Sequence, residues 1–224
     1  MTALPSSPRD LARLIDHTAL APTLGRSAID KLCDEALEHG FCSVCVQPCW
    51  VAHAAERLAG AEPRVCTVIG FPLGCTTSAS KAAEAREAIA AGAEELDMVM
   101  NLGWLLSGDE QAVRADVAAV VEAAGGRLVK VILESARLEL AQIELASKLA
   151  VEGGAHFVKT STGFGPGGAS VEAVACMRAS VGADIGVKAS GGIRDAAAAR
   201  AMIEAGATRI GASASLALVG GWTG

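Results

Sequence analysis

Short apolar runs and alanine-rich stretches alternate along the whole chain. Runs of Val, Ile, Leu and Thr that are bounded by turn-forming residues predict β-strands. Successive runs begin about 20 to 33 residues apart, which is the spacing of consecutive strand–helix units. Eight strands are predicted in this way: Leu14–Thr18, Ser43–Val46, Val65–Gly70, Leu96–Asn101, Leu128–Glu134, Phe157–Ser161, Gly186–Ser190 and Thr208–Gly211.

Helix signals occupy the intervals between these runs. Ser107, with Glu110 three residues later, predicts a capping box at the start of a helix. Asp195 is expected to cap a helix over Ala196–Ala205, and Gly206 is expected to end it. Joints in which a glycine and a small residue lead into a strand recur along the chain, and they fit short helix-to-strand loops.

Eight strand–helix units in succession predict an α/β fold, a (β/α)₈ TIM barrel. No Pro/Ser-rich linker or block of like charge divides the sequence, so a single domain over residues 1–224 is expected. A doubly wound open sheet is the alternative. Such a sheet usually carries a Gly-rich nucleotide-binding turn after its first strand, and Thr18–Pro22 contains no glycine.

The composition narrows the possible partners and the compartment. Hydrophobic residues make up 51% and aromatic residues 3%, so the core must consist mainly of Ala, Val, Leu and Ile. A net charge of −6 argues against nucleic acid or an anionic membrane as a partner. No apolar run approaches the roughly 18 residues of a membrane span, and the N-terminal sequence lacks a signal pattern. We therefore expect a cytoplasmic protein.

The cysteines and histidines give little support for a metal. Seven cysteines, an odd number, suit reduced thiols better than a disulfide framework. Cys42, Cys45 and Cys49 suggest a metal site, but residues three apart in a strand point to opposite faces. The four histidines form no ligand-spaced group, and His17 is expected to have a packing or supporting role. We expect neither a metal nor another cofactor.

Charged residues interrupt several of the apolar strands. Alternation places Lys130 and Glu134 on the same face of their strand. Charges from so many strands could meet only inside a barrel, where three positive and three negative groups would roughly neutralise one another. Such a cluster is either a structural ion-pair network or a catalytic site. Its expected members are Asp16, Asp97, Lys130, Glu134, Lys159 and Lys188.

Two of these lysines favour catalysis. Lys159 lies in an apolar run, where burial of an ammonium group is costly unless it loses its proton or is paired. A partly neutral lysine is the nucleophile of Schiff-base enzymes. Lys188, on the next strand, would repel it and favour the neutral amine, and Asp97 could move protons through a water. The alternative for Lys159 is a lysine that reaches solvent from an edge strand.

Gly-rich turns follow the sixth, seventh and eighth predicted strands. They are residues 162–168, 190–194 and 211–213. In a barrel these turns lie at the end where backbone N–H groups commonly hold a phosphate. Three adjacent turns of this kind favour a phosphate site over three ordinary tight turns.

The motifs around these residues resemble those of the bacterial deoxyribose-phosphate aldolase family over nearly the whole length. The matching segments are Leu14–Thr18, Val65–Gly74, Glu95–Val99, Lys130–Glu134, Phe157–Gly163 and Gly186–Arg194. The resemblance implies that Lys159 forms the Schiff base, that Lys188 tunes it and that Asp97 transfers protons. It also implies metal-free, reversible cleavage of 2-deoxy-D-ribose 5-phosphate to acetaldehyde and D-glyceraldehyde 3-phosphate by a homodimer.

The expected substrate-binding residues come from six of the predicted strands and their turns. Cys45 is included, although a role as a small core residue is favoured for it. The set is Asp16, Thr18, Cys45, Lys130, Thr162, Gly163, Gly191, Gly192, Gly211 and Ser213.

Two departures from the family pattern concern the site. Residues 211–215 read Gly-Ala-Ser-Ala-Ser where the family commonly has Gly-Thr-Ser-Ser-Gly, so two hydroxyls are lost and one is displaced. The chain also has no tyrosine, whereas some members use a C-terminal tyrosine in proton transfer. Two other functions remain open at this point. One is a different imine-forming enzyme, such as a transaldolase-like barrel, and the other is a non-catalytic barrel that binds a sugar phosphate.

Overall fold

Eight parallel strands close into a barrel in the computed structural model, which describes residues 4–224. Each strand pairs with the next in sequence, and β8 pairs with β1, Ile15 lying opposite Ile210. The strands are β1 (Ile15–Ala19), β2 (Ser43–Val46), β3 (Arg64–Ile69), β4 (Glu95–Val99), β5 (Leu128–Ile132), β6 (Phe157–Lys159), β7 (Gly186–Ser190) and β8 (Arg209–Ala212).

The predicted (β/α)₈ TIM barrel is therefore confirmed, and the closing β8–β1 pair excludes an open sheet. All eight predicted strands are present, and β2 and β7 have the predicted bounds. The predicted ends of β4, β5 and β6 run two residues too far, because the apolar or small residues Met100, Leu133 and Thr160 continue the strand pattern past the end of each strand. The predicted domain includes residues 1–3, which lie outside the described residues.

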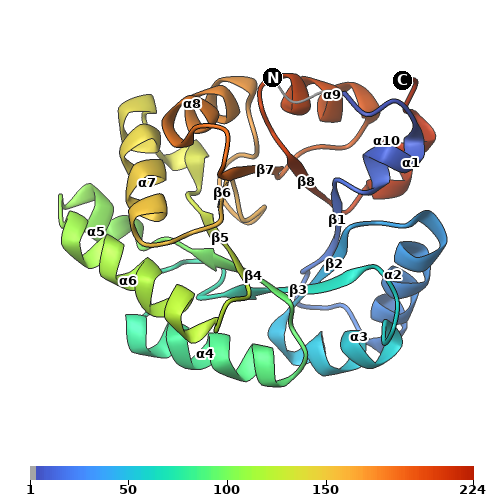
Figure 1. The fold of residues 1–224 in the computed structure, drawn as a ribbon, viewed down its shortest axis with the longest axis horizontal. Helices are drawn as coiled ribbons and strands as arrows, with labels where there is room; N and C mark the ends of the chain where they lie inside the picture. Colours follow the sequence, from blue (N-terminus) through green and yellow to red (C-terminus); the bar gives the residue numbers. More distant parts are fainter. Residues whose placement is uncertain (1–3) are drawn as a thin grey trace.

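Helices surround the barrel as an outer ring, and α1 and α10 lie side by side near the two chain ends (Figure 1). Two short 3₁₀ turns, Pro48–Trp50 and Ser135–Arg137, complete the regular structure of the described residues. The helices are α1 (Pro8–Ala12), α2 (Arg26–His39), α3 (Val51–Arg57), α4 (Ser78–Ala90), α5 (Leu102–Leu106), α6 (Glu110–Ala123), α7 (Leu140–Glu152), α8 (Val171–Val181), α9 (Ala196–Glu204) and α10 (Ser215–Gly220).

One predicted helix cap is wrong and another is confirmed. The α6 helix begins after Asp109, whose carboxylate accepts the N–H of Ala112 at 3.0 Å. Ser107 instead ends α5, because its hydroxyl donates to a carbonyl in that preceding helix. Asp195 caps α9 as predicted, accepting the N–H of Ala198 at 2.8 Å.

The aliphatic core lies between the barrel and the helices, while the barrel interior is charged. Strand residues such as Val131 and Val158 point outwards and join one large apolar cluster with the helices. This outer layer also contains a buried ion pair between α4 and α6. The Nζ of Lys81 lies 2.6 Å from an Asp116 carboxylate oxygen and donates to the Val99 carbonyl at 2.9 Å.

Across residues 4–224, every helix is too short or too polar to cross a bilayer.

Candidate active site

Seven charged side chains form one network inside the barrel. All are buried, and together they come from six of the eight strands. Burial of so many charges is tolerable because each carboxylate contacts at least two cations. The members are the cations Lys130, Lys159, Lys188 and Arg209 and the carboxylates Asp16, Glu95 and Asp97.

Asp97 contacts all three lysines of this network. Its Oδ2 accepts hydrogen bonds from the Nζ atoms of Lys159 at 2.8 Å and Lys188 at 2.7 Å. Its Oδ1 accepts from Lys130 at 2.8 Å. Burial alone would raise the pKa of Asp97, but these three ammonium groups hold that pKa well below its usual value of about 3.9. The carboxylate is therefore ionised.

The other two carboxylates of the network, Asp16 and Glu95, hold Lys188 and Lys130 in place. Lys130 lies 2.6 Å from Glu95, and Arg209 lies 2.6 Å from Asp16. Lys188 is also paired with Asp16. Burial disfavours the ammonium form of Lys188, but Asp16 and Asp97 outweigh it and raise the pKa of Lys188 above its usual range. Lys188 is thus a fixed positive charge.

The membership of the network differs from the prediction at three positions. Glu134 was expected inside the barrel, but it lies just beyond β5 with a left-handed φ of 51°, which turns its side chain out of the strand's alternation. Its carboxylate instead accepts the backbone N–H of Thr162 at 3.3 Å. Glu95 and Arg209 take part in its place. Their positions two residues before Asp97 and Gly211 are the sequence signal that could have identified them.

Buried thiols lie beside the same carboxylate. The Sγ of Cys66 is 3.3 Å from Asp97 and 3.4 Å from the Nζ of Lys130, and Cys45 is its cross-strand partner on β2. Burial and the neighbouring Cys45 raise the pKa of Cys66 well above its usual range. Cys45, Cys66 and Asp97 are close enough to hold a metal ion, but the ammonium group of Lys130 already supplies a cation at two of these three side chains.

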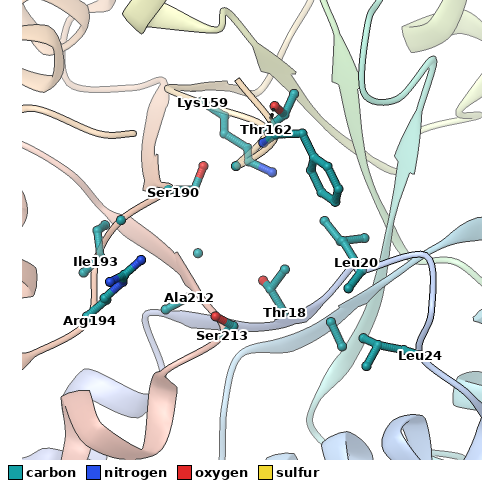
Figure 2. Close-up of a pocket in the computed structure, with 17 residues that line it drawn as sticks. Thr18, Leu20, Leu24, Lys159, Thr162, Ser190, Ile193, Arg194, Ala212 and Ser213 are labelled. Atoms are coloured by element: carbon teal, nitrogen blue, oxygen red, sulfur yellow. Dashed lines mark hydrogen bonds between the residues drawn. The ribbon is translucent and has the colours of Figure 1, made fainter. Parts of the chain in front are cut away.

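A cavity of about 400 Å³ opens above the network at the carboxyl ends of the strands. Lys159 is the network residue that reaches it, and Figure 2 shows its amine pointing into the open space. The cavity is also lined by seven of the predicted binding residues: Thr18, Thr162, Gly163, Gly191, Gly192, Gly211 and Ser213. The other predicted site residues, Asp16, Cys45, Asp97, Lys130 and Lys188, lie buried beneath it.

Several cavity residues were missed by the sequence analysis. Arg194 lines the cavity and brings a second cationic side chain to it besides Lys159 (Figure 2). The glycines before Arg194 directed the prediction to backbone N–H groups and away from this side chain. Leu20, Leu24 and Phe164 add apolar surface to the cavity. Each belongs to a loop, where periodicity carries no information about direction.

Two Gly-rich turns of the cavity rim touch through their backbones. The N–H of Ala169 donates to the Gly191 carbonyl at 3.0 Å. A Cβ atom added at Gly168 would lie 2.1 Å from that same oxygen, so only glycine fits there. The turns after β6 and β7 are therefore locked to each other, and Gly191 of the second turn lines the cavity.

A lysine amine at the floor of a barrel cavity, with a carboxylate and a second ammonium group beside it, is suited to a lyase that works through an imine. Comparison with known proteins makes the assignment more specific. The profile of the DeoC/LacD family aldolases matches residues 11–221. The chain belongs to this family.

Relatives with high identity carry one common name. The deoxyribose-phosphate aldolase of Brevibacillus brevis is 58% identical over 95% of this chain and 96% of its own length. Deoxyribose-phosphate aldolase 1 of Bacillus licheniformis is 56% identical over 96% of this chain and 97% of its own. A solved deoxyribose phosphate aldolase from Aeropyrum pernix, described as tetrameric, matches with a TM-score of 0.87 and 35% identity, covering 96% and 91% of the two chains.

Proposed function

We propose that this chain is a class I aldolase that reversibly cleaves 2-deoxy-D-ribose 5-phosphate to D-glyceraldehyde 3-phosphate and acetaldehyde, in deoxyribonucleoside catabolism. The observation that carries the proposal is the Nζ of Lys159 at the cavity floor, 2.8 Å from Asp97. The names of the relatives supply the sugar, and the cavity supports a phosphorylated substrate through its Gly-rich turns.

The reaction begins with Lys159. Its neutral amine attacks C1 of the open-chain sugar, and the carbinolamine that forms loses water to give an iminium ion. Lys188 stays protonated, since its contacts with Asp16 and Asp97 stabilise its charge. A positive charge at this position favours the uncharged form of the nearby amine and so supports the attack.

Asp97 then moves the proton that accompanies bond cleavage. Through a water molecule, it accepts the proton of the C3 hydroxyl while the C2–C3 bond breaks and its electron pair passes into the enamine. C3 leaves as the aldehyde carbon of D-glyceraldehyde 3-phosphate. Because the ammonium groups of Lys130 and Lys188 hold the pKa of Asp97 low, the carboxylate passes the proton on and does not retain it. Protonation of the enamine at C2 and hydrolysis release acetaldehyde and the free lysine.

The phosphate group is held at the rim by backbone N–H groups of the three turns, with Ser213 and Arg194 as side-chain partners. The loss of two hydroxyls at Ala212 and Ala214 leaves more of the binding to these groups. Of the other predicted residues, Asp16 and Lys130 act from beneath the cavity by pairing with Lys188 and Asp97, and Cys45 lies buried there beside Cys66.

Three further proposals concern the whole protein. We propose that residues 1–224 form one domain, that two chains form a homodimer and that the enzyme works in the cytoplasm. The closed barrel supports the first, and the resemblance to the family supports the second. The free state of all seven cysteines supports a reducing compartment. Sedimentation of the purified protein tests the dimer.

The imine itself provides the decisive test. The protein is mixed with acetaldehyde and borohydride, and the reduced two-carbon adduct is located by peptide mass spectrometry. An adduct confined to Lys159, and absent from Lys159→Ala, is expected, while Lys148→Ala, at an exposed lysine, keeps it. An adduct on Lys130 or Lys188 would move the nucleophile to another lysine. Folded protein that gives no site-specific adduct would overturn the proposal in favour of a barrel that only binds its ligand.

A further inference from the structure

Behind the cavity, a chain of polar contacts leads from α2 to the turn that follows β8. The Nε2 of His17 lies 2.8 Å from the Oε2 of Glu35, and its Nδ1 lies 2.9 Å from the Oγ of Ser215. That hydroxyl is also 3.0 Å from the carbonyl oxygen of Ala212. His17 and Ser215 are buried, and neither lines the cavity.

This chain of contacts closes the turn on itself. His17 pairs directly with Ala212 in the β1–β8 ladder, so the two residues are already fixed side by side. The imidazole then reaches past Ala212 to Ser215, and Ser215 bonds back to Ala212. Ser213 lies between these two tied residues and lines the cavity. The position of its hydroxyl therefore depends on a contact made on the opposite side of the turn.

The local charges keep this arrangement in place. Glu35 is the acidic partner of His17, Lys31 lies 3.7 Å from Glu35, and the ring of Phe41 packs 4.9 Å from the imidazole on its other side. His39, at the end of α2, is the other titratable group facing His17. A protonated imidazole donates Nε2–H to Glu35 and Nδ1–H to Ser215, which leaves the Ser215 proton for the Ala212 carbonyl. A neutral imidazole that donates Nε2–H to Glu35 accepts the Ser215 proton at Nδ1 instead, and that proton is then not available to Ala212. The contact with Ser215 survives in either state.

We propose that His17 and Ser215 are positioning residues, which hold the turn Gly211–Ser213 in the conformation that binds the substrate phosphate. Where the family commonly has threonine and serine at positions 212 and 214 and glycine at 215, this chain has two alanines and a serine. That serine, Ser215, supports the turn from the side away from the cavity. Support from behind then compensates for the hydroxyls missing at Ala212 and Ala214. The inference rests on the proposed function, because it assigns the turn to the phosphate of that substrate.

The test compares a phosphorylated substrate with an unphosphorylated one. Ser215→Ala removes the hydroxyl, and we expect the KM for 2-deoxyribose 5-phosphate to rise about tenfold with kcat little changed, the size of effect that corresponds to one lost hydrogen bond. The KM for 2-deoxyribose, which lacks the phosphate, should stay within about twofold of wild type. Ser147→Ala is the matched control, since it removes a buried hydroxyl that bonds within α7, away from the cavity.

A second pair of variants keeps the test decisive if Ser215→Ala folds poorly. His17→Leu removes both polar contacts, whereas His17→Asn keeps a polar atom near the position of Nδ1 and should restore most of the affinity for the phosphorylated substrate. Equal KM increases for both sugars, or no increase for either, would overturn the proposal. If wild-type protein formed no acetaldehyde adduct on Lys159, the proposed function itself would be contradicted. That assay involves no phosphate, so its outcome is independent of the role of His17 and Ser215.

Discussion

Lys159 and Lys188 donate hydrogen bonds to the same oxygen, Oδ2 of Asp97, at 2.8 and 2.7 Å. Two ammonium groups on one carboxylate oxygen cannot be equivalent, because Lys188 has a second carboxylate partner in Asp16, whereas Lys159 opens into the cavity. Lys188 is therefore a fixed charge, and Lys159 is the amine that a substrate can reach. The shared oxygen therefore assigns the two lysines different roles.

Replacing Lys188 by methionine should shift the acidic limb of the pH–rate profile to higher pH by about 1 to 2 units. Without the neighbouring positive charge, protonation of Lys159 meets less repulsion, so more alkaline conditions are needed for the neutral amine. The measurement is kcat/KM for sugar cleavage between pH 5 and 10. Lys188→Arg, which keeps the charge, serves as the control, and an unchanged profile in Lys188→Met would show that Lys188 is not the perturbing charge.

Removing one partner of the buried Lys81–Asp116 pair should destabilise the fold far more than removing both. Lys81→Met leaves a buried carboxylate without its cation, and we expect a loss of about 3 to 5 kcal/mol in the free energy of unfolding. The double variant Lys81→Met with Asp116→Leu should recover most of that loss, since an apolar pair fits between two helices. Urea unfolding of the single and double variants gives both values. Additive losses would contradict the expectation.

Gly168→Ala should disturb the rim of the cavity. The new Cβ would lie 2.1 Å from the Gly191 carbonyl oxygen, so one of the two turns must move. Overpacking of this kind costs about 1 to 3 kcal/mol of stability, and we expect kcat/KM to fall because Gly191 lines the cavity. Gly220→Ala is the control, since an added Cβ there meets no atom within 4 Å. Equal behaviour of the two variants would show that the contact is unimportant.

The carboxylates of the network should make the stability fall with acidification. The folded-state pKa values of Asp16 and Asp97 lie below the unfolded-state value of about 3.9, despite burial, because of the lysine and arginine charges around them. Such groups stabilise the fold fully above the unfolded pKa, and the contribution is lost as pH falls through the folded pKa. The free energy of unfolding should therefore decline steeply below about pH 4.

Asp16→Asn tests the origin of that decline. The variant should be less stable at pH 7, because Lys188 and Arg209 lose a partner, but its stability should depend less on pH in the acidic range. Asp34→Asn changes an exposed carboxylate and should follow the wild-type curve. Urea titrations at pH 7, 5 and 3 supply the comparison, and parallel curves for Asp16→Asn and wild type would exclude Asp16 as a source.

The sequence allowed the fold to be predicted because a barrel repeats one local pattern eight times. Each strand carries its own apolar run, and each helix exit carries its own glycine, so an error at one element leaves the others intact. The wrong cap at Ser107 shows the limit of such local signals. A serine between two helices can end the first or begin the second, and the sequence does not distinguish the two.

The site was predictable only where alternation along a strand determines direction. Asp97, Lys159 and Lys188 meet inside the barrel because each lies on an inward position of a regular strand. Glu134 fails this rule because its own backbone is left-handed, which ends the alternation of the strand at this residue. Arg194 lies in a loop, and the contact between His17 and Ser215 joins residues 198 positions apart. Their roles depend on tertiary placement, which no local pattern encodes.

The cationic side chain of Arg194 at the cavity has a consequence for how substrate arrives. With Lys159 as the neutral nucleophile, three cations balance three carboxylates inside the barrel, while the chain as a whole carries a net charge of −6. An anion approaching the molecule therefore meets a repelling exterior, with a local positive potential at the cavity where Arg194 lies. Low-dielectric walls concentrate such a potential, so phosphorylated sugars are guided towards the amine while other surfaces turn them away. Added salt would weaken this guidance and slow encounter.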